Sequence, residues 1–137
     1  MLDHTADVGF ELEAPTLEDL FDEARQALLM TLFERPPERG EEESSVRLSA
    51  SDLETLLVRW INELAFLIQG EGYVPVRANV RIKDSGRDDF SLEAGLTGAP
   101  LDLESQGWQG EMKSATFHGL DVKQGDEGWQ TRVILDV

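Results

Sequence analysis

Three places in the chain combine side chains that could take part in chemistry. The first is residues 3–9, with the sequence DHTADVG, where two aspartates, a histidine and a threonine fall within seven positions. The second is residues 113–120, KSATFHGL, which holds a lysine and a histidine. The third is the end of the chain, where Asp136 precedes the carboxylate of Val137. Carboxylate oxygens are the ligands that Ca²⁺ and Mg²⁺ prefer, so these residues indicate hard-cation chemistry.

Asp7 and Asp136 are the side chains that could hold such a cation, and the carboxylate of Val137 adds another oxygen donor if Val137 is the natural end of the chain. Asp7 lies beside a predicted first strand and Asp136 ends a predicted last strand. The two aspartates meet only if these strands are neighbours in a sheet, and sequence spacing leaves that adjacency open. The alternative is two unrelated carboxylates, with residues 3–9 forming an ordinary solvated loop.

Lys113 and His118 form a second group of candidates. The pKa of histidine lies near neutrality, which makes His118 a plausible acid–base group. Lys113 could neutralise an acidic cluster or reach a phosphate. The alternatives are a strand histidine that only satisfies hydrogen bonds and a solvated strand lysine.

Several kinds of site are excluded because their motifs are missing. The chain has no G-x-x-x-x-G-K-[ST] phosphate loop, no strand-linked G-x-G-x-x-G and no H-E-x-x-H. A Ser-His-Asp triad is not excluded by counting residues, but no serine lies in a G-x-S-x-G elbow, so nucleophilic catalysis has weak support. Two histidines and no cysteine exclude three-histidine and thiolate zinc sites. The lack of cysteine fits a cytoplasmic location. No apolar run approaches the roughly 20 residues of a membrane span, and no signal peptide is visible, so no membrane association is expected.

The net charge of −16 is the strongest compositional feature. A surface this negative repels phosphate backbones, so no direct high-affinity nucleic-acid binding is expected. It favours cations or a basic protein partner. The alternative is that the charge serves only solubility.

The elements that must position these residues follow from hydrophobic periodicity. Apolar residues at helical spacing predict one helix from Leu17 to about Phe33 and a second from Leu53 to a stop at Gly70. Thr16 and Ser51 are the predicted N-caps of these helices. Alternation predicts strands over residues 8–13, 74–82, 90–96 and 129–135. A short strand is expected over residues 46–50, and one or two strands over residues 112–122.

The order of these elements predicts the fold class. Residues 34–43 are expected to form a charged loop and residues 98–110 an irregular segment. Trp60 is expected in the core, with a partner for its indole N–H. The sequence therefore predicts an α+β fold, in which two helices pack on a mixed, largely antiparallel β-sheet, in a single domain over residues 1–137.

Four stretches, taken in order, resemble the archease family. Residues 3–9 resemble its opening signature, residues 52–64 its second helix, and residues 129–137 its final strand. Residues 113–120 resemble its K-A-x-T-[YF]-H-G-L segment, with Ser114 where alanine is common. Family members usually have a few more residues before the first motif. The resemblance spans nearly the whole chain.

This resemblance implies an accessory protein, rather than an enzyme, that activates an RtcB-type RNA ligase in tRNA splicing. Such a protein promotes guanylylation of the ligase and its multiple turnover. The family's metal site carries over to Asp7, Asp136 and Val137, with Ca²⁺ as the family's ion and Mg²⁺ or Mn²⁺ as alternatives. His4 then takes a supporting role, holding the loop by hydrogen bonds, beside Lys113 and His118.

Two other functions compete with this one. The first is a stand-alone metal-dependent enzyme acting on a phosphorylated substrate, with Asp7, Asp136, His118 and Lys113 as its site; it would show turnover without a partner. The second is a module whose apolar helix faces bind a peptide. It would require large exposed apolar patches on the helices.

Overall fold

The computed structural model describes the backbone of residues 7–112 and 114–136, with all side chains in these ranges except those of Asp7, Ser114 and residues 116–120. The strands are β1 (Asp7–Ala14), β2 (Glu42–Ala50), β3 (Tyr73–Asp84), β4 (Phe90–Pro100), β5 (Ser114–Gly125) and β6 (Gly128–Asp136). The helices are α1 (Leu17–Leu32), α2 (Leu53–Glu71) and the short α3 (Leu103–Gln106). The predicted α+β class is confirmed.

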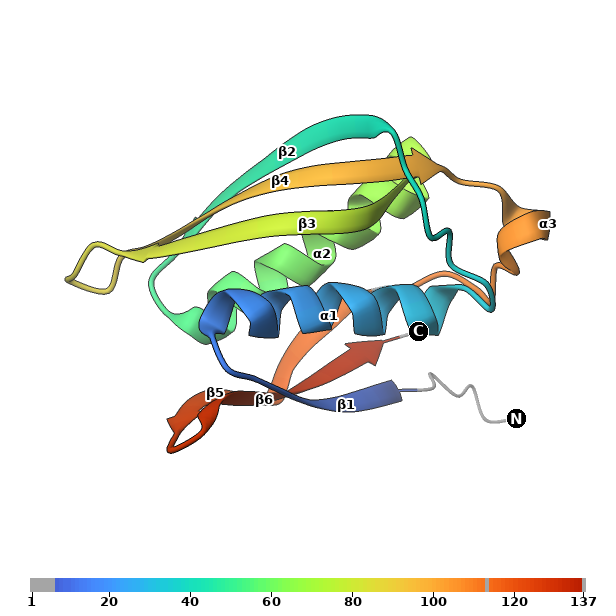
Figure 1. Ribbon diagram of the computed structural model, residues 1–137. Helices are drawn as coiled ribbons and strands as arrows, with labels where there is room; N and C mark the ends of the chain where they lie inside the picture. The colour runs from blue at the N-terminus through green and yellow to red at the C-terminus, as the bar shows by residue number, and fades with distance from the viewer. Residues whose placement is uncertain (1–6, 113, 137) are drawn as a thin grey trace.

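The strands form two three-stranded antiparallel sheets, ordered β1-β6-β5 and β2-β4-β3. The two long helices lie between the sheets (Figure 1). α1 packs on β1, β6 and β3, whereas α2 packs on β5 and on all three strands of the other sheet. The order of elements in the sequence predicted a single sheet. Two sheets form because the buried surface of α2 is wide, including Val58 and Ala65 beside the main apolar stripe, and a second layer must cover it.

The N-terminus of α1 follows the prediction. Thr16 is the N-cap, and its hydroxyl accepts a hydrogen bond from the Asp19 amide at 3.1 Å. This satisfies one of the amides that the first turn of a helix leaves without a partner. The predicted core position of Trp60 is also confirmed, because the residue is fully buried and its indole N–H donates to the Phe21 carbonyl oxygen at 2.8 Å.

Both predicted ends of α2 are wrong by one or two residues. The N-cap is Asp52 rather than Ser51, and its carboxylate accepts a hydrogen bond from the Thr55 amide at 2.7 Å. A carboxylate also complements the positive end of the helix dipole, which a hydroxyl does less well. The helix passes Gly70 and ends where Gly72 adopts the left-handed conformation, with φ of 66°.

Two predicted irregular segments contain regular structure. β2 begins at Glu42, inside the predicted loop, because residues 42–45 pair with the end of β4. All four of these side chains are exposed, so the sequence there shows no alternation. Residues 98–110 contain the last residues of β4 and the helix α3.

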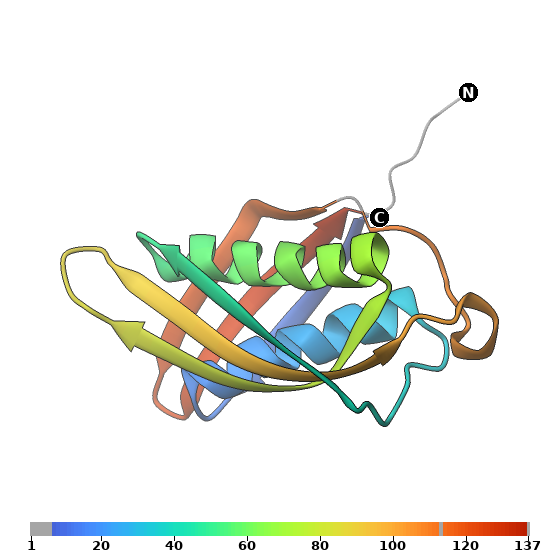
Figure 2. The same cartoon turned by 90° about the horizontal axis from the view of Figure 1, so that it is seen from above.

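The end of β4 is packed too closely for any side chain on one glycine. A Cβ on Gly98 would lie 2.6 Å from the Val74 carbonyl oxygen and closer still to the Tyr73 ring. The β3–β4 hairpin extends beyond the helices at the opposite end of the molecule (Figure 2). Among the described helices, none has the length and apolar composition needed to cross a membrane.

Candidate metal site at the ends of the chain

The first and last strands are neighbours, which the sequence left open. β1 and β6 pair antiparallel from Ala14 opposite Trp129 to Asp7 opposite Asp136. Positions paired in this way have Cβ atoms about 4.5–5.5 Å apart on one face of the sheet. The register therefore brings the two predicted aspartate ligands to one place.

β6 shows why Asp136 lies on the outward face of its sheet. Val133 and Leu135 are buried against the helices, with exposed fractions of 2% and 1%. Successive side chains alternate between the two faces of a strand. Ile134 and Asp136 therefore belong to the face turned away from the helix layer.

Asp136 also has a neighbour on its other side. β6 is the central strand of its sheet, and Ser114 of β5 is the second cross-strand partner of Asp136. Ser114 belongs to the KSATFHGL stretch. Asp7, Asp136 and Ser114 therefore lie in one cross-strand row, and this row contains one residue from each of the three stretches singled out in the sequence. Further along β5, the pairing with β6 shifts between Thr116 and Asp121, within the same stretch.

One oxygen of Asp136 has no hydrogen-bond partner in the described part of the chain. Its Oδ1 atom is buried and has no hydrogen bond to any residue that the structure describes. Burying an unpaired polar atom is costly, and native structures rarely leave one unexplained. A cation bound at this position would satisfy the oxygen. The donor chemistry of Asp136 therefore fits a hard cation.

The positions of the remaining predicted site residues or of their side chains are not described by the structure. His4, Lys113 and Val137 lie outside the described residues, as do the side chains of Asp7 and His118. Within residues 7–112 and 114–136, no group of three or more histidine, cysteine or acidic side chains is gathered closely enough to hold a metal ion. The full ligand set thus stays a prediction.

Three side chains of α2 hold the backbone of β5 and the residues that lead into it. Glu54 Oε2 accepts from the Val122 amide at 2.9 Å, and Asn62 Oδ1 accepts from the Ala115 amide at 2.8 Å. Gln69 makes two bonds to Met112, accepting from its amide at 2.6 Å and donating to its carbonyl oxygen at 2.9 Å. We call Glu54, Asn62 and Gln69 the helix clasp.

The helix clasp was missed in the sequence analysis. β5 is an edge strand, so backbone groups along its open side need partners from outside the sheet. The clasp residues are spaced eight and seven positions apart, which places them along one flank of α2. The sequence feature that could have indicated the helix clasp is the line of polar residues that runs along α2 beside its apolar stripe. The clasp fixes where the KSATFHGL stretch begins.

Fold and site together define a class of protein. It is a small α+β protein whose first and last strands pair to bring two aspartates together, next to a stretch held by a helix. Residues 1–137 match the model of the Archease protein family (MTH1598/TM1083). The chain belongs to the archease family.

Relatives of similar length support this assignment. The chain is 32% identical to the archease of Pyrobaculum islandicum over 136 residues, covering 98% of this chain and 92% of that protein. It is 29% identical to the archease of Methanosarcina barkeri, covering 99% and 93%.

Two solved structures are similar in fold. The solution structure of Methanobacterium thermoautotrophicum protein 1598 aligns with a TM-score of 0.75 at 28% identity, over 99% of this chain and 96% of that one. The crystal structure of an archease from Thermotoga maritima, described as a possible chaperone, aligns with a TM-score of 0.64. At 22% identity, over 100% and 95% of the two chains, this second likeness shows the fold alone.

Proposed function

We propose that this protein is an accessory factor that activates an RtcB-type RNA ligase in tRNA splicing, promoting guanylylation of the ligase and its multiple turnover. The observation that supports this proposal most is the pairing of Asp7 with Asp136, together with the buried Oδ1 of Asp136, which has no partner among the residues that the structure describes. Family membership supports the role, because three of the four stretches that carry the resemblance meet at this row of the sheet.

Asp7, Asp136 and the terminal carboxylate of Val137 would hold a divalent cation, Ca²⁺ in the first instance and Mg²⁺ or Mn²⁺ as alternatives. When bound, the cation would supply positive charge that polarises phosphate oxygens. The protein itself would position the groups that bind the cation and the supporting residues. Strand pairing places the two aspartates, and the helix clasp places the stretch that carries Lys113 and His118, the proposed supporting residues.

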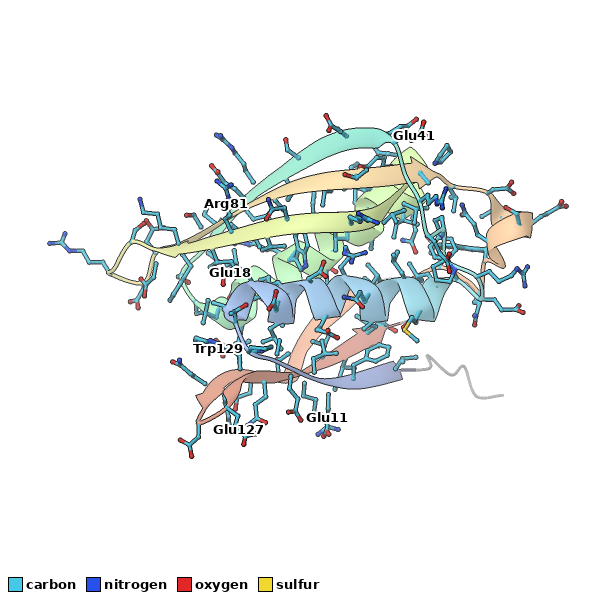
Figure 3. The ribbon with its side chains drawn as sticks, viewed as in Figure 1. Glu11, Glu18, Glu41, Arg81, Glu127 and Trp129 are labelled. Atoms are coloured by element: carbon cyan, nitrogen blue, oxygen red, sulfur yellow. The ribbon has the colours of Figure 1, made fainter. Side chains whose placement is uncertain are left out.

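Acidic loops surround this end of the molecule. β6 runs toward the end at which α3 and the segment between α1 and β2 lie (Figure 1). These segments carry six exposed acidic side chains against the exposed Arg35 and Arg39, namely those of Glu34, Glu38, Glu41, Asp102, Glu104 and Glu111. Figure 3 shows Glu41 projecting into solvent there. Such a field speeds association with a basic protein surface, as the proposed ligase would present.

The test is a comparison of two aspartate-to-asparagine variants with the unmodified protein. Asp136→Asn keeps the shape of the side chain and removes its charge, whereas Asp126→Asn makes the same change on the exposed β5–β6 turn. The ligase is supplied with labelled guanine nucleotide and, separately, with excess RNA ends. We expect Asp136→Asn to abolish stimulation of guanylylation and of multiple turnover, and Asp126→Asn to retain both.

Full stimulation by Asp136→Asn would overturn the site. No stimulation by the unmodified protein would overturn the ligase partnership itself. Turnover of a phosphorylated substrate by the protein alone would instead favour the stand-alone enzyme.

A further inference from the structure

The outward face of the β2-β4-β3 sheet is basic, although the whole chain carries a net charge of −16. Alternation along the three strands places twelve residues on this face. Four are basic and two are acidic, a net charge of +2. The members of this basic face are Glu43, Ser45, Arg47, Ser49, Arg77, Asn79, Arg81, Lys83, Ser91, Glu93, Gly95 and Thr97.

The register arranges the charges in rows. Arg47 and Arg81 flank Glu93 across the three strands, Lys83 lies opposite Ser91, and Arg77 lies opposite Thr97. Arg47 Nε lies 3.4 Å from Glu93 Oε1, with side chains 82% and 60% exposed. No other ion pair involves this face among the described residues. Figure 3 shows Arg81 on the side of the sheet away from the helices.

The opposite face of the molecule has the opposite sign. On the outward side of the β1-β6-β5 sheet, Glu11, Glu13, Asp121 and Asp136 outnumber Lys123 and Arg132, which gives a net charge of −2 among the described side chains. The helix layer separates the two faces (Figure 1). The molecule therefore presents a basic sheet on one side and the candidate metal site on the other.

The composition of the basic face favours a phosphate backbone over a protein partner. Protein interfaces usually have an aromatic or aliphatic anchor at the centre. This face has none, and its side chains are arginine, lysine, serine, threonine and asparagine, the types that contact nucleic-acid phosphates and sugars. It also lacks aromatic residues on which bases could stack, so contact would be with the backbone and independent of sequence.

A shallow depression lies in the middle of the face. It is lined by Ser45, Arg47, Asn79, Arg81, Glu93 and Gly95, among others. A Cβ built on Gly95 meets no atom within 4 Å, so the missing side chain leaves open space between Ser45 and Asn79, next to the row of Arg47, Glu93 and Arg81. This depression offers room for a phosphate group beside guanidinium donors, which suit phosphate geometry.

We propose that the basic face binds the phosphate backbone of the RNA whose ends the ligase joins. This deepens the proposed function and rests on it for the identity of the RNA. The acidic end of the molecule then faces the ligase while the basic sheet faces the strand. The large net negative charge keeps the isolated interaction weak, which accords with the expectation that the protein does not bind nucleic acid with high affinity.

Gly95 provides a sharp test because a side chain there meets nothing. Gly95→Glu places a negative charge in the depression, and Gly95→Gln adds nearly the same volume without charge. Binding of a fluorescent, unstructured RNA oligonucleotide to the protein alone is measured by anisotropy at low salt. We expect Gly95→Glu to bind about fourfold more weakly than Gly95→Gln, the effect of one unit charge about 5 Å from a phosphate in water.

Neutral variants on the two sheets provide a second, independent comparison. Arg81→Gln removes a charge from the basic face, and Arg132→Gln makes the same change on the outward face of the other sheet. We expect Arg81→Gln to reduce the magnitude of the slope of log K against log salt by about 0.7, as loss of one phosphate contact on a single strand requires, and Arg132→Gln to leave it unchanged. No detectable RNA binding at low salt, or equal effects of both changes, overturns the proposal.

Assays with the ligase separate this proposal from the function on which it rests. Guanylylation needs no RNA, so Gly95→Glu should stimulate it fully while raising the KM for RNA in multiple turnover. If Gly95→Glu impairs guanylylation without RNA, the face contacts the ligase and the RNA proposal is wrong. If RNA binds as expected but the protein never stimulates the ligase, the basic face stands and the proposed function fails.

Discussion

Asp7 of β1 lies directly across from Asp136 of β6, so two acidic residues from opposite ends of the chain occupy one row of a sheet. Like charges in directly opposed positions destabilise an antiparallel pair. A fold that keeps such a pair, and leaves Asp136 Oδ1 buried without a partner among the described residues, is one that a cation would stabilise.

This pairing predicts that Asp136→Asn stabilises the protein when no Ca²⁺ is bound and makes it the less stable of the two proteins when Ca²⁺ is present. In a chelator, the variant should be more stable than the unmodified protein by about 0.2–1 kcal/mol, because the repulsion is gone. With Ca²⁺ at about 100 times its Kd, the unmodified protein should gain about 2.7 kcal/mol and several degrees in Tm. Thermal unfolding with and without Ca²⁺ measures both effects.

Asp126→Asn, on the exposed turn, is the control and should respond to Ca²⁺ as the unmodified protein does. An equal Ca²⁺-dependent rise in Tm for Asp136→Asn would remove Asp136 from the ligand set. Repeating the titration with Mg²⁺ and Mn²⁺ ranks the three ions.

The helix clasp predicts that Gln69→Ala loosens the segment before β5. Met112 is 2% exposed, and both of its backbone groups bond to the Gln69 side chain. Removing that side chain leaves a buried amide and carbonyl unpaired, at a cost of about 1–3 kcal/mol for each group left unsatisfied. Urea unfolding measures the loss, and faster hydrogen exchange at the Met112 amide locates it.

Gln26→Ala is the matched control, because Gln26 is exposed and, among the described residues, its side chain bonds only to the Asp22 side chain on its own helix. It should cost no more than about 0.5 kcal/mol. Normal protection of the Met112 amide in Gln69→Ala would mean that other groups hold this segment.

The N-cap of α2 predicts a dependence of stability on pH. The hydrogen bonds from Thr55 lower the pKa of Asp52 below its ordinary value of 3.8. The folded state therefore favours the charged carboxylate, and the resulting stabilisation is present above pH 3.8 and is lost as pH falls through the lowered pKa. Asp52→Asn still caps the helix but cannot titrate.

The unmodified protein should exceed Asp52→Asn in free energy of unfolding by about 0.3–1 kcal/mol near neutral pH, the size of a charge–dipole interaction. The difference should vanish as the pH falls well below 3.8. Chemical denaturation across this pH range measures it. A difference that stays constant with pH would show that the charge of Asp52 does not contribute.

The sequence predicted those parts of the fold that have a strong hydrophobic period. Each of α1, α2 and the β3–β4 hairpin buries one face, so apolar residues recur at regular spacing along it. The existence of these elements could therefore be predicted from the local sequence alone. The first four residues of β2 could not, because all are exposed and their only structural signal is pairing with β4. The division into two sheets was also hidden, since strand partners are not encoded in any one segment.

The candidate site shows the same limit. Residue types singled out Asp7 and Asp136, but their meeting depends on which strands become neighbours, a property of the whole chain. The helix clasp and the basic face depend on both register and sheet topology. Each consists of ordinary polar residues that become informative only when the strands are placed.

Arg25 is a charged residue among the apolar positions of a predicted helix, and its place there could have indicated a buried polar contact. It lies in the apolar stripe of α1 and is 6% exposed. Its Nη1 atom donates to the Pro75 and Val76 carbonyl oxygens at 3.1 and 2.7 Å, and its Nε atom contacts Asp22 Oδ1 at 2.7 Å. The β3–β4 register shifts at these residues, between Pro75 and Arg77, so Arg25 holds an irregular point of β3 against α1.

Arg25→Met should therefore destabilise the protein by about 2–5 kcal/mol, since it leaves two buried carbonyl groups without a donor. Arg25→Lys keeps the charge but lacks the planar fork that reaches both carbonyls and Asp22 together, so it should recover only part of the loss. Arg39→Met, at an exposed position, is the control and should stay within about 0.5 kcal/mol. Urea unfolding gives all three values. Full recovery by lysine would mean that charge alone matters here, and that the shifted register of β3 does not depend on the guanidinium geometry.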